Sequence, residues 1–131
     1  MKQDVHSDSF ARLEYDDSLK CLELIWLDTT VDMSDEDFRR WLEVFALKGA
    51  EFGTSFMLVD GRSFKLEMTS ELNAWRQEVI IPMYNTAGVR KFAFLLPEVA
   101  ESDTEPRPEA GAEFPTAYFD SRDQIEAWFD A

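Results

Sequence analysis

The sequence predicts an α/β domain with a mixed, mostly parallel sheet that begins with an antiparallel hairpin and has helices packed on it. Two apolar runs, at residues 56–59 and 92–96, show no alternation of polar and apolar side chains, as is typical of strands covered on both faces. A segment with helical spacing of its apolar residues separates the two runs, which indicates a βαβ unit. The 131 residues suffice for one domain without disulfides or metals, so we expect a single domain over 1–131.

The amino-terminal part predicts the hairpin. Residues 1–9 are polar, and we expect them to be disordered. Residues 10–15 and 19–27 are rich in apolar and β-branched or aromatic side chains, and a short acidic turn at 16–18 joins them. The first of these two strands is predicted to form the edge of the sheet.

A long helix is predicted next. Ser34, followed three residues later by Asp37, resembles a capping box, and Gly53 is suited to the left-handed end of the helix. Apolar residues recur at helical spacing and predict one buried stripe, formed by Phe38, Trp41, Leu42, Phe45, Gly49 and Phe52.

A second helix is predicted to start at Thr69 or Ser70 and to end at Gly88. Pro82 lacks an N–H and its ring crowds the carbonyl of Glu78, so we expect a kink or a break near 83–85. The inner stripe is predicted to contain Leu72, Trp75, Val79, Ile80 and Met83.

The carboxyl-terminal part is predicted to hold a loop, a strand and a helix. Residues 97–113 are rich in Pro and Glu without periodicity, which predicts a mobile acidic surface loop. A short strand over 116–119 follows, and then Asp120 as the cap of a last helix. Ile125, Trp128 and Phe129 are predicted to point inward.

Charge and composition limit the classes of partner. The net charge is −14, from 27 acidic and 13 basic residues, and this sign argues against nucleic acid and anionic membrane surfaces. A solvated acidic surface is the first interpretation, and a basic protein partner is the alternative. Cys21 is the only cysteine, and no apolar stretch suits a signal peptide or membrane helix, so we expect no membrane insertion and a cytoplasmic protein.

Four runs of sequence, in this order, carry a resemblance to a known family. They are LVDGRSF, TSELNAW, IIPMYNTAGVRKFAFLLPE and YFDSRDQIEAWF. Together they resemble the STAS family, in particular small stand-alone bacterial proteins similar to the sporulation anti-sigma factor antagonist, and more loosely Sec14-type lipid-binding domains. The resemblance implies a STAS-like fold and a non-catalytic regulatory or protein-interaction function, with a kinase or an anti-sigma factor as the implied partner.

The loop after the first βαβ strand is the candidate regulatory site. In the family's regulators an Asp-Ser-Ser/Thr-Gly loop carries a phosphorylated hydroxyl, whereas the loop here is longer and lacks the Ser-Ser-Gly sequence. One interpretation is phosphorylation or anion binding at this loop, and the other is simple helix capping and turn formation. The residues concerned are Asp60, Arg62, Ser63, Thr69 and Ser70.

No catalytic or metal-binding motif is present. His6 is the only histidine, and it falls in the segment expected to be disordered, so no catalytic triad is predicted and we expect no enzyme and no cofactor. Asp28, Asp32 and Asp35 lack the glycine and terminal glutamate of an EF-hand, so no metal site is predicted.

An apolar ligand pocket is the alternative function. Aromatic residues are numerous, and a surplus lining a cavity between sheet and helices would suit a small-molecule or lipid carrier, with Trp75, Tyr84 and Tyr118 as candidates. A homodimer surface around Pro82, formed by Ile81, Met83 and Tyr84, is a further hypothesis.

Overall fold

The computed structural model describes residues 2–131, without the side chains of residues 101 and 102. The described strands are β1 (Lys2–Ser7), β2 (Ala11–Asp16), β3 (Cys21–Trp26), β4 (Phe56–Asp60), β5 (Lys91–Leu95), β6 (Arg107–Pro108) and β7 (Pro115–Phe119). The helices are α1 (Asp35–Phe52), α2 (Ser70–Trp75), α3 (Ile81–Ala87) and α4 (Arg122–Asp130). Short 3-10 turns cover Asp28–Asp32 and Glu101–Thr104.

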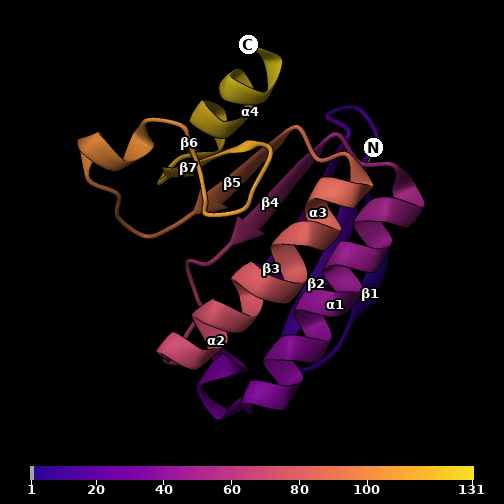
Figure 1. Ribbon diagram of the computed structural model, residues 1–131, viewed down its shortest axis with the longest axis vertical. Coiled ribbons are helices and arrows are strands. Elements are labelled where there is room, and N and C mark those ends of the chain that lie inside the picture. The colour runs from indigo at the N-terminus through magenta and orange to yellow at the C-terminus, as the bar shows by residue number, and fades with distance from the viewer. Residues whose placement is uncertain (1) are drawn as a thin grey trace.

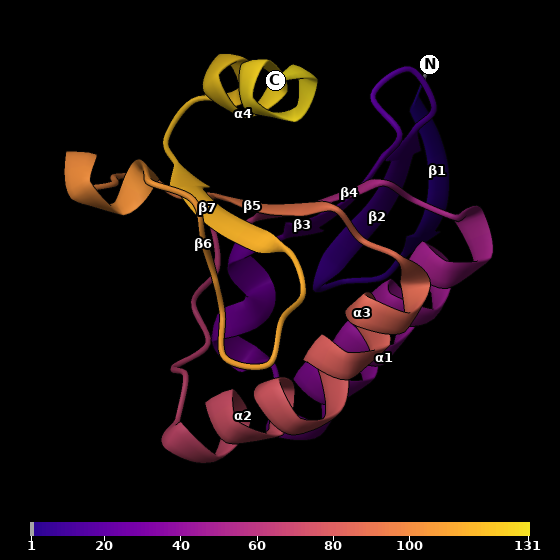
Figure 2. The same ribbon diagram turned by 45° about the horizontal axis from the view of Figure 1, so that its top comes forward.

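One seven-stranded sheet organises these elements, in the order β1-β2-β3-β4-β5-β7-β6. The α/β class is confirmed, but the sheet is not mostly parallel. Three neighbouring pairs, from β3 to β7, are parallel, and the three pairs at the two ends are antiparallel. Helices α1 and α3 lie on one face of the sheet, and α4 lies on the other (Figure 1, Figure 2).

The amino-terminal segment is a strand and not a disordered end. β1 pairs with β2 along almost its whole length, with a bulge between Asp4 and His6. Val5 packs against the core, and the His6 ring lies 5.1 Å from the ring of Trp41. β1 therefore forms this edge of the sheet, a position that the sequence predicted for β2. Met1 lies outside the described residues.

Helix α1 begins and ends where the sequence predicts. The Ser34 hydroxyl accepts a hydrogen bond from the Asp37 N–H at 3.1 Å, and the Asp37 carboxylate accepts one from the Ser34 N–H at 3.3 Å. This reciprocal pair is a capping box, and Gly53 ends the helix with a left-handed φ of 61°. Most of the predicted stripe is buried; Phe52 is only half-buried, and Ala46 joins the stripe.

The second helix is interrupted in its middle. Thr69 caps it, accepting a hydrogen bond from the Leu72 N–H at 3.1 Å. Residues Arg76–Ile80 then form a π turn, in which the Ile81 N–H reaches back five residues to the Arg76 carbonyl. Pro82 follows directly in α3, so the irregularity expected from this proline takes the form of a wider turn that gives its ring room.

The π turn changes which side chains face inward. The wider turn shifts the buried side of the helix by one residue from Ile80 onward. Ile80, Ile81 and Tyr84 are therefore fully buried, whereas Val79 is 41% exposed. The prediction of Val79 on the inner stripe was therefore wrong. Ile81 and Tyr84 belong to the core, so the homodimer surface predicted around Pro82 does not exist as an exposed patch.

The acidic segment 97–113 is anchored at several points. β6 pairs with β7, the Asn85 amide donates to the Gly111 carbonyl at 2.8 Å, and the Glu113 N–H donates to the Asn85 side chain at 2.8 Å. Helix α4 follows β7, with Ser121 as its N-cap in place of the predicted Asp120. Ile125 and Phe129 of α4 are buried as expected, and Trp128 is half-buried.

Two apolar clusters lie on the two faces of the sheet. The larger one joins the sheet to α1, α2 and α3, and the smaller one joins it to α4. Strands β4 and β5 contribute to both clusters, which explains why their sequences show no alternation.

Candidate ligand pocket

An aromatic pocket of about 310 Å³ lies on the α1 and α2 side of the sheet, near the carboxyl ends of the parallel strands. In α/β proteins ligands are commonly bound outside the carboxyl ends of the strands, and this volume is at the lower end of the range of known ligand sites. We call it the aromatic pocket. Its walls are formed by Trp26, Phe38, Leu42, Val59, Gly61, Phe64, Met68, Asn73, Arg76, Tyr84, Phe92, Phe94, Leu96, Glu109 and Tyr118.

The floor of the aromatic pocket is apolar. Trp26, Val59 and Phe92 come from three neighbouring strands and are nearly fully buried. Phe94 and Tyr118 stack at a centroid distance of 5.1 Å and an interplanar angle of 12°, and both are half-buried. Flat ring surfaces of this kind suit an aromatic or otherwise planar guest.

A buried ion pair forms part of the wall. Arg76, in the π turn, donates to both oxygens of Glu109, at 2.6 and 3.1 Å, and the two side chains are 12% and 18% exposed. The guanidinium carbon also lies 5.6 Å from the ring centroids of both Phe92 and Phe94. Burial by itself would lower the pKa of Arg76, but the hydrogen bonds to Glu109 and the nearby charge interactions together outweigh it and leave the pKa raised, so the guanidinium keeps its charge.

One buried hydroxyl, that of Tyr84, has no hydrogen-bond partner among the described residues. Tyr84 is fully buried, and its hydroxyl is the only buried side-chain nitrogen or oxygen without a hydrogen bond among the described residues. Burial raises the pKa of Tyr84 and also that of Tyr118, so both phenols keep their protons at neutral pH. Leaving such a group unsatisfied costs on the order of 1–3 kcal/mol.

The predicted pocket residues are only partly brought together. Tyr84 and Tyr118 are among the residues that line the aromatic pocket, but Trp75 is not. Trp75 is half-buried beside α1, where the Arg39 guanidinium lies 5.8 Å from its ring centroid. The neighbouring Arg76, four residues after Leu72, lines the pocket instead.

Arg76 and Glu109 were missed by the sequence analysis. A signal for Arg76 was present, because it lies four residues after Leu72 and four before Ile80, both of which were assigned to the inner stripe. A charged residue in such a row needs a partner. No comparable signal pointed to Glu109, which belongs to the segment predicted as a mobile loop.

The predicted regulatory loop is divided in two. Asp60, Arg62 and Ser63 share a shallow depression with Arg12 and Arg122 at the end of β4, on the α4 face, and Thr69 and Ser70 are not among its lining residues. Asp60 accepts hydrogen bonds from Arg62 at 3.0 and 2.8 Å and from Arg122 at 3.3 Å. The Asp60 carboxylate therefore pairs with two arginines. Thr69 acts as the cap of helix α2.

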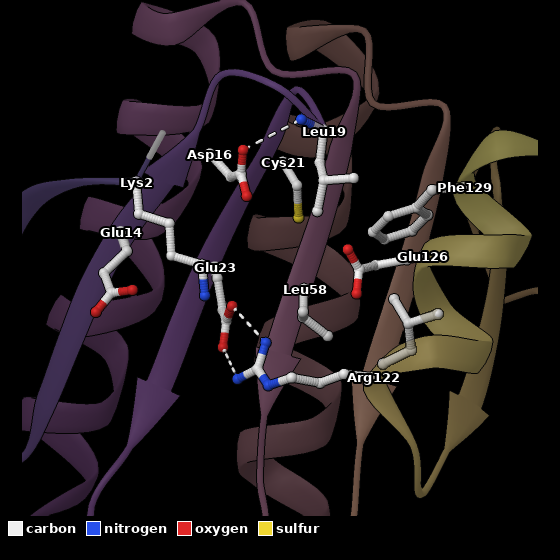
Figure 3. A pocket seen from close by; sticks show the side chains of 11 residues that line it. Lys2, Glu14, Asp16, Leu19, Cys21, Glu23, Leu58, Arg122, Glu126 and Phe129 are labelled. Carbon is white, nitrogen blue, oxygen red and sulfur yellow. Dashed lines mark hydrogen bonds and ion pairs between the residues drawn. The ribbon is translucent and has the colours of Figure 1, made fainter.

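A smaller hollow of about 80 Å³ lies between β2, β3 and α4. Figure 3 shows Arg122 extending from the start of α4 past Leu58 to Glu23, with which it forms two hydrogen bonds, one of them at 2.9 Å. Cys21 also lines this hollow, and burial raises the pKa of its thiol. Arg122 and Glu23 pair with each other here, and the hollow is too small for more than a few waters.

The remaining candidate residues do not form a site. His6 lies on β1, beside a small depression lined also by Asp8, Asp37, Arg40, Trp41 and Val44. Asp28 and Asp32 lie in a 3-10 turn and Asp35 begins α1, and among the side chains that the structure describes no group of three acidic, histidine or cysteine residues is placed to hold a metal ion.

None of the described helices combines the length and the apolar character needed to cross a bilayer. Comparison with known proteins gives no match to any family model, curated protein or solved structure.

Proposed function

We propose that this protein binds a small, largely apolar molecule in the aromatic pocket and acts as a carrier or sensor of that molecule. The observation that carries the proposal is the ion pair between Arg76 and Glu109 in the wall of an otherwise aromatic pocket. A buried ion pair contributes little to stability compared with apolar residues of the same size, because both charges lose their hydration. Apolar walls with a few fixed polar groups are the usual composition of small-molecule sites.

Binding of a neutral fluorescent probe tests this function. N-phenylnaphthylamine is titrated into the full-length protein, and its fluorescence and the melting temperature of the protein are recorded. We expect the fluorescence to rise on binding and the melting temperature to rise with probe concentration, because a ligand that binds only the folded state stabilises it.

A pair of tryptophan variants locates the site. Met68 lines the aromatic pocket and is half-buried, so Met68→Trp should fill part of it and weaken probe binding by about tenfold or more. Leu47 lies on α1 and is 60% exposed, so Leu47→Trp is the matched control and should bind the probe as the original protein does. Absence of binding, or equal binding by both variants, would contradict the proposal.

A regulatory function of the kind that the STAS resemblance implies is the second proposal. Ser70 supports it, because this hydroxyl is exposed at the first residue of α2, where a phosphate would meet a helix amino terminus. Phosphopeptide mapping of protein purified from its native cells in several growth states tests it. Protein that is unmodified at Ser63, Thr69 and Ser70 in every state would exclude this switch.

A further inference from the structure

Three arginines meet in the depression at the end of β4. Arg12, Arg62 and Arg122 line it together with the Ser63 side chain and a single carboxylate, that of Asp60. Positive charge is thus concentrated here in a chain that has 27 acidic and only 13 basic residues. The volume is about 480 Å³, which is in the range of known ligand sites. We call it the arginine depression.

The register of the sheet sets the width of the arginine depression. Arg12 on β2 lies opposite Ile25 on β3, and Ile25 lies opposite Asp60 on β4. Neighbouring strands lie about 4.8 Å apart, so the Cα atoms of Arg12 and Asp60 are about 10 Å apart on one face of the sheet. The half-buried Ile25 lies between them. An anion above Ile25 would therefore have Arg12 on one side and the guanidinium groups bound to Asp60 on the other.

Buried carboxylates hold two of the three guanidinium groups in place. Asp60 binds Arg62 through two hydrogen bonds and Arg122 through one, and Glu23 accepts from both terminal nitrogens of Arg122. The Asp60 and Glu23 side chains are only 6% and 7% exposed, against 50% for Arg62 and 35% for Arg122. Since the carboxylates are covered and the arginines are not, the arginines are fixed from below and remain open to a ligand.

Donor groups remain on both of these arginines. Nη1 of Arg62 and Nε of Arg122 donate no hydrogen bond to a described residue. The hydrogen bond to Asp60 raises the pKa of Arg62 against the opposing charge of Arg122, so the two guanidinium groups are close enough to repel each other. An anion beside both groups would reduce that repulsion.

Arg12 is the third guanidinium, and it is held less firmly. Its side chain is 54% exposed, and its one ion-pair partner among the described residues, Glu14, lies 3.9 Å away. This distance is too long for a hydrogen bond. Arg12 can therefore turn toward an anion without breaking a hydrogen bond of the fold.

We infer that the arginine depression binds a phosphate group, either as the free ion or as the ester of a small molecule. Arginine pairs with phosphate oxygens through two parallel hydrogen bonds. A phosphate group carries about two negative charges and offers oxygens in three directions, whereas a planar carboxylate offers two oxygens and one charge. The net charge of −14 repels polyanions, which favours a small ligand. This inference does not depend on the aromatic pocket.

Titration of three anions into the full-length, ¹⁵N-labelled protein tests the inference. Phenyl phosphate, inorganic phosphate and benzoate are added at pH 7.5 and low ionic strength, and the side-chain N–H signals of the arginines are followed by NMR. We expect saturable shifts for Arg62 and Arg122, and about tenfold tighter binding of phenyl phosphate than of benzoate. Inorganic phosphate binding as tightly as phenyl phosphate would identify the free ion as the ligand, and weaker binding would identify an ester.

The Arg12→Gln variant assigns the binding to this depression. It should weaken phenyl phosphate binding by about fivefold or more and leave the melting temperature unchanged, because Arg12 makes no hydrogen bond within the described fold. Arg107→Gln is the matched control, since Arg107 is 74% exposed on β6, at the opposite edge of the sheet. It removes the same charge and should preserve binding.

Three results would overturn the phosphate site. They are the absence of saturable shifts with both phosphates, benzoate binding as tight as that of phenyl phosphate, and equal affinity of Arg12→Gln and Arg107→Gln for phenyl phosphate. None of them bears on the aromatic pocket, which is tested separately with an uncharged probe.

Discussion

Asp60 shows at the level of one residue how the end of a buried strand can hold a charge. Its side chain is 6% exposed, and burial opposes its ionisation. The hydrogen bonds and charge of Arg62, together with the charge of Arg122, outweigh burial and lower the pKa of Asp60 below its usual value. The carboxylate thereby connects the end of β4 to the start of α4.

We predict that Asp60→Asn destabilises the protein in a pH-dependent way. A carboxylate with a lowered pKa in the folded state stabilises above its unfolded pKa, near 4, and this contribution is lost as the pH falls through the folded value. The variant should therefore unfold with a free energy about 2 kcal/mol lower at pH 7, and the difference should shrink below about pH 4. Urea denaturation at several pH values measures both.

Exposed Asp32 provides the control for this prediction. Asp32→Asn should change the free energy of unfolding little at any pH, because no charged partner among the described residues holds this side chain in a fixed geometry. An Asp60→Asn deficit of the same size at pH 3 and at pH 7 would contradict the assigned role of its charge.

At the level of elements, two helices in this chain begin differently. Helix α1 has a complete capping box at Ser34, whereas Ser121 precedes α4 without a capping hydrogen bond from its side chain. The same residue type therefore satisfies the helix amino terminus in one case only. The pair allows the energy of the cap to be measured within one protein.

We predict that Ser34→Ala lowers the free energy of unfolding by about 1 kcal/mol, because the Asp37 N–H loses its acceptor. Ser121→Ala, the matched control, should change it by much less. Chemical denaturation monitored by far-UV circular dichroism gives both values. Equal losses in the two variants would show that the Ser34 hydroxyl contributes nothing beyond helix propensity.

The elements that could be predicted from the sequence are those with local causes. The caps at Ser34 and Thr69 and the stop at Gly53 depend on residues within one or two turns, and the structure confirms all three. β1 could not be predicted, because a polar edge strand is held mainly by main-chain pairing with β2, which leaves little mark on side-chain pattern.

The candidate site was less predictable for a related reason. Tyr84 and Tyr118 could be chosen from their residue type and position, but the wall that they share depends on a contact between Arg76 and Glu109, 33 residues apart. The link between Arg122 and Glu23 spans 99 residues. Nothing in the local sequence of either partner specifies the other.

At the level of the whole molecule, the two faces of the sheet have different roles. A small hollow on the α4 face holds the ion pair of Arg122 and Glu23, whereas the opposite face carries the aromatic pocket. Segment 97–113 joins the second face to the edge of the sheet, since Glu109 pairs with Arg76 while β6 pairs with β7. The ion pair in the pocket wall therefore also holds this segment against the sheet.

We predict that Glu109→Gln loosens segment 97–113 and destabilises the fold. Arg76 would keep its charge in a buried position without a carboxylate, which should lower the free energy of unfolding by about 3 kcal/mol. Hydrogen exchange followed by mass spectrometry should show faster exchange in this segment than in the original protein.

A surface pair in the same segment supplies the control. Arg107 and Glu105 lie 3.5 Å apart and are 74% and 72% exposed, so Glu105→Gln should leave both stability and exchange nearly unchanged. Matching behaviour of the two variants would mean that burial of the Glu109 pair has no influence on the segment.

The π turn before Pro82 also has a consequence for chain length. The helix from α2 to α3 holds one residue more than regular winding would need to keep Leu72 and Tyr84 on the same side, and the widened turn absorbs that residue beside the proline ring. The extra residue and the proline therefore belong together, because the turn that absorbs the residue also makes room for the proline ring. A homologous chain without the proline is free to be one residue shorter here, so a single gap in an alignment at this point would leave the pocket wall intact.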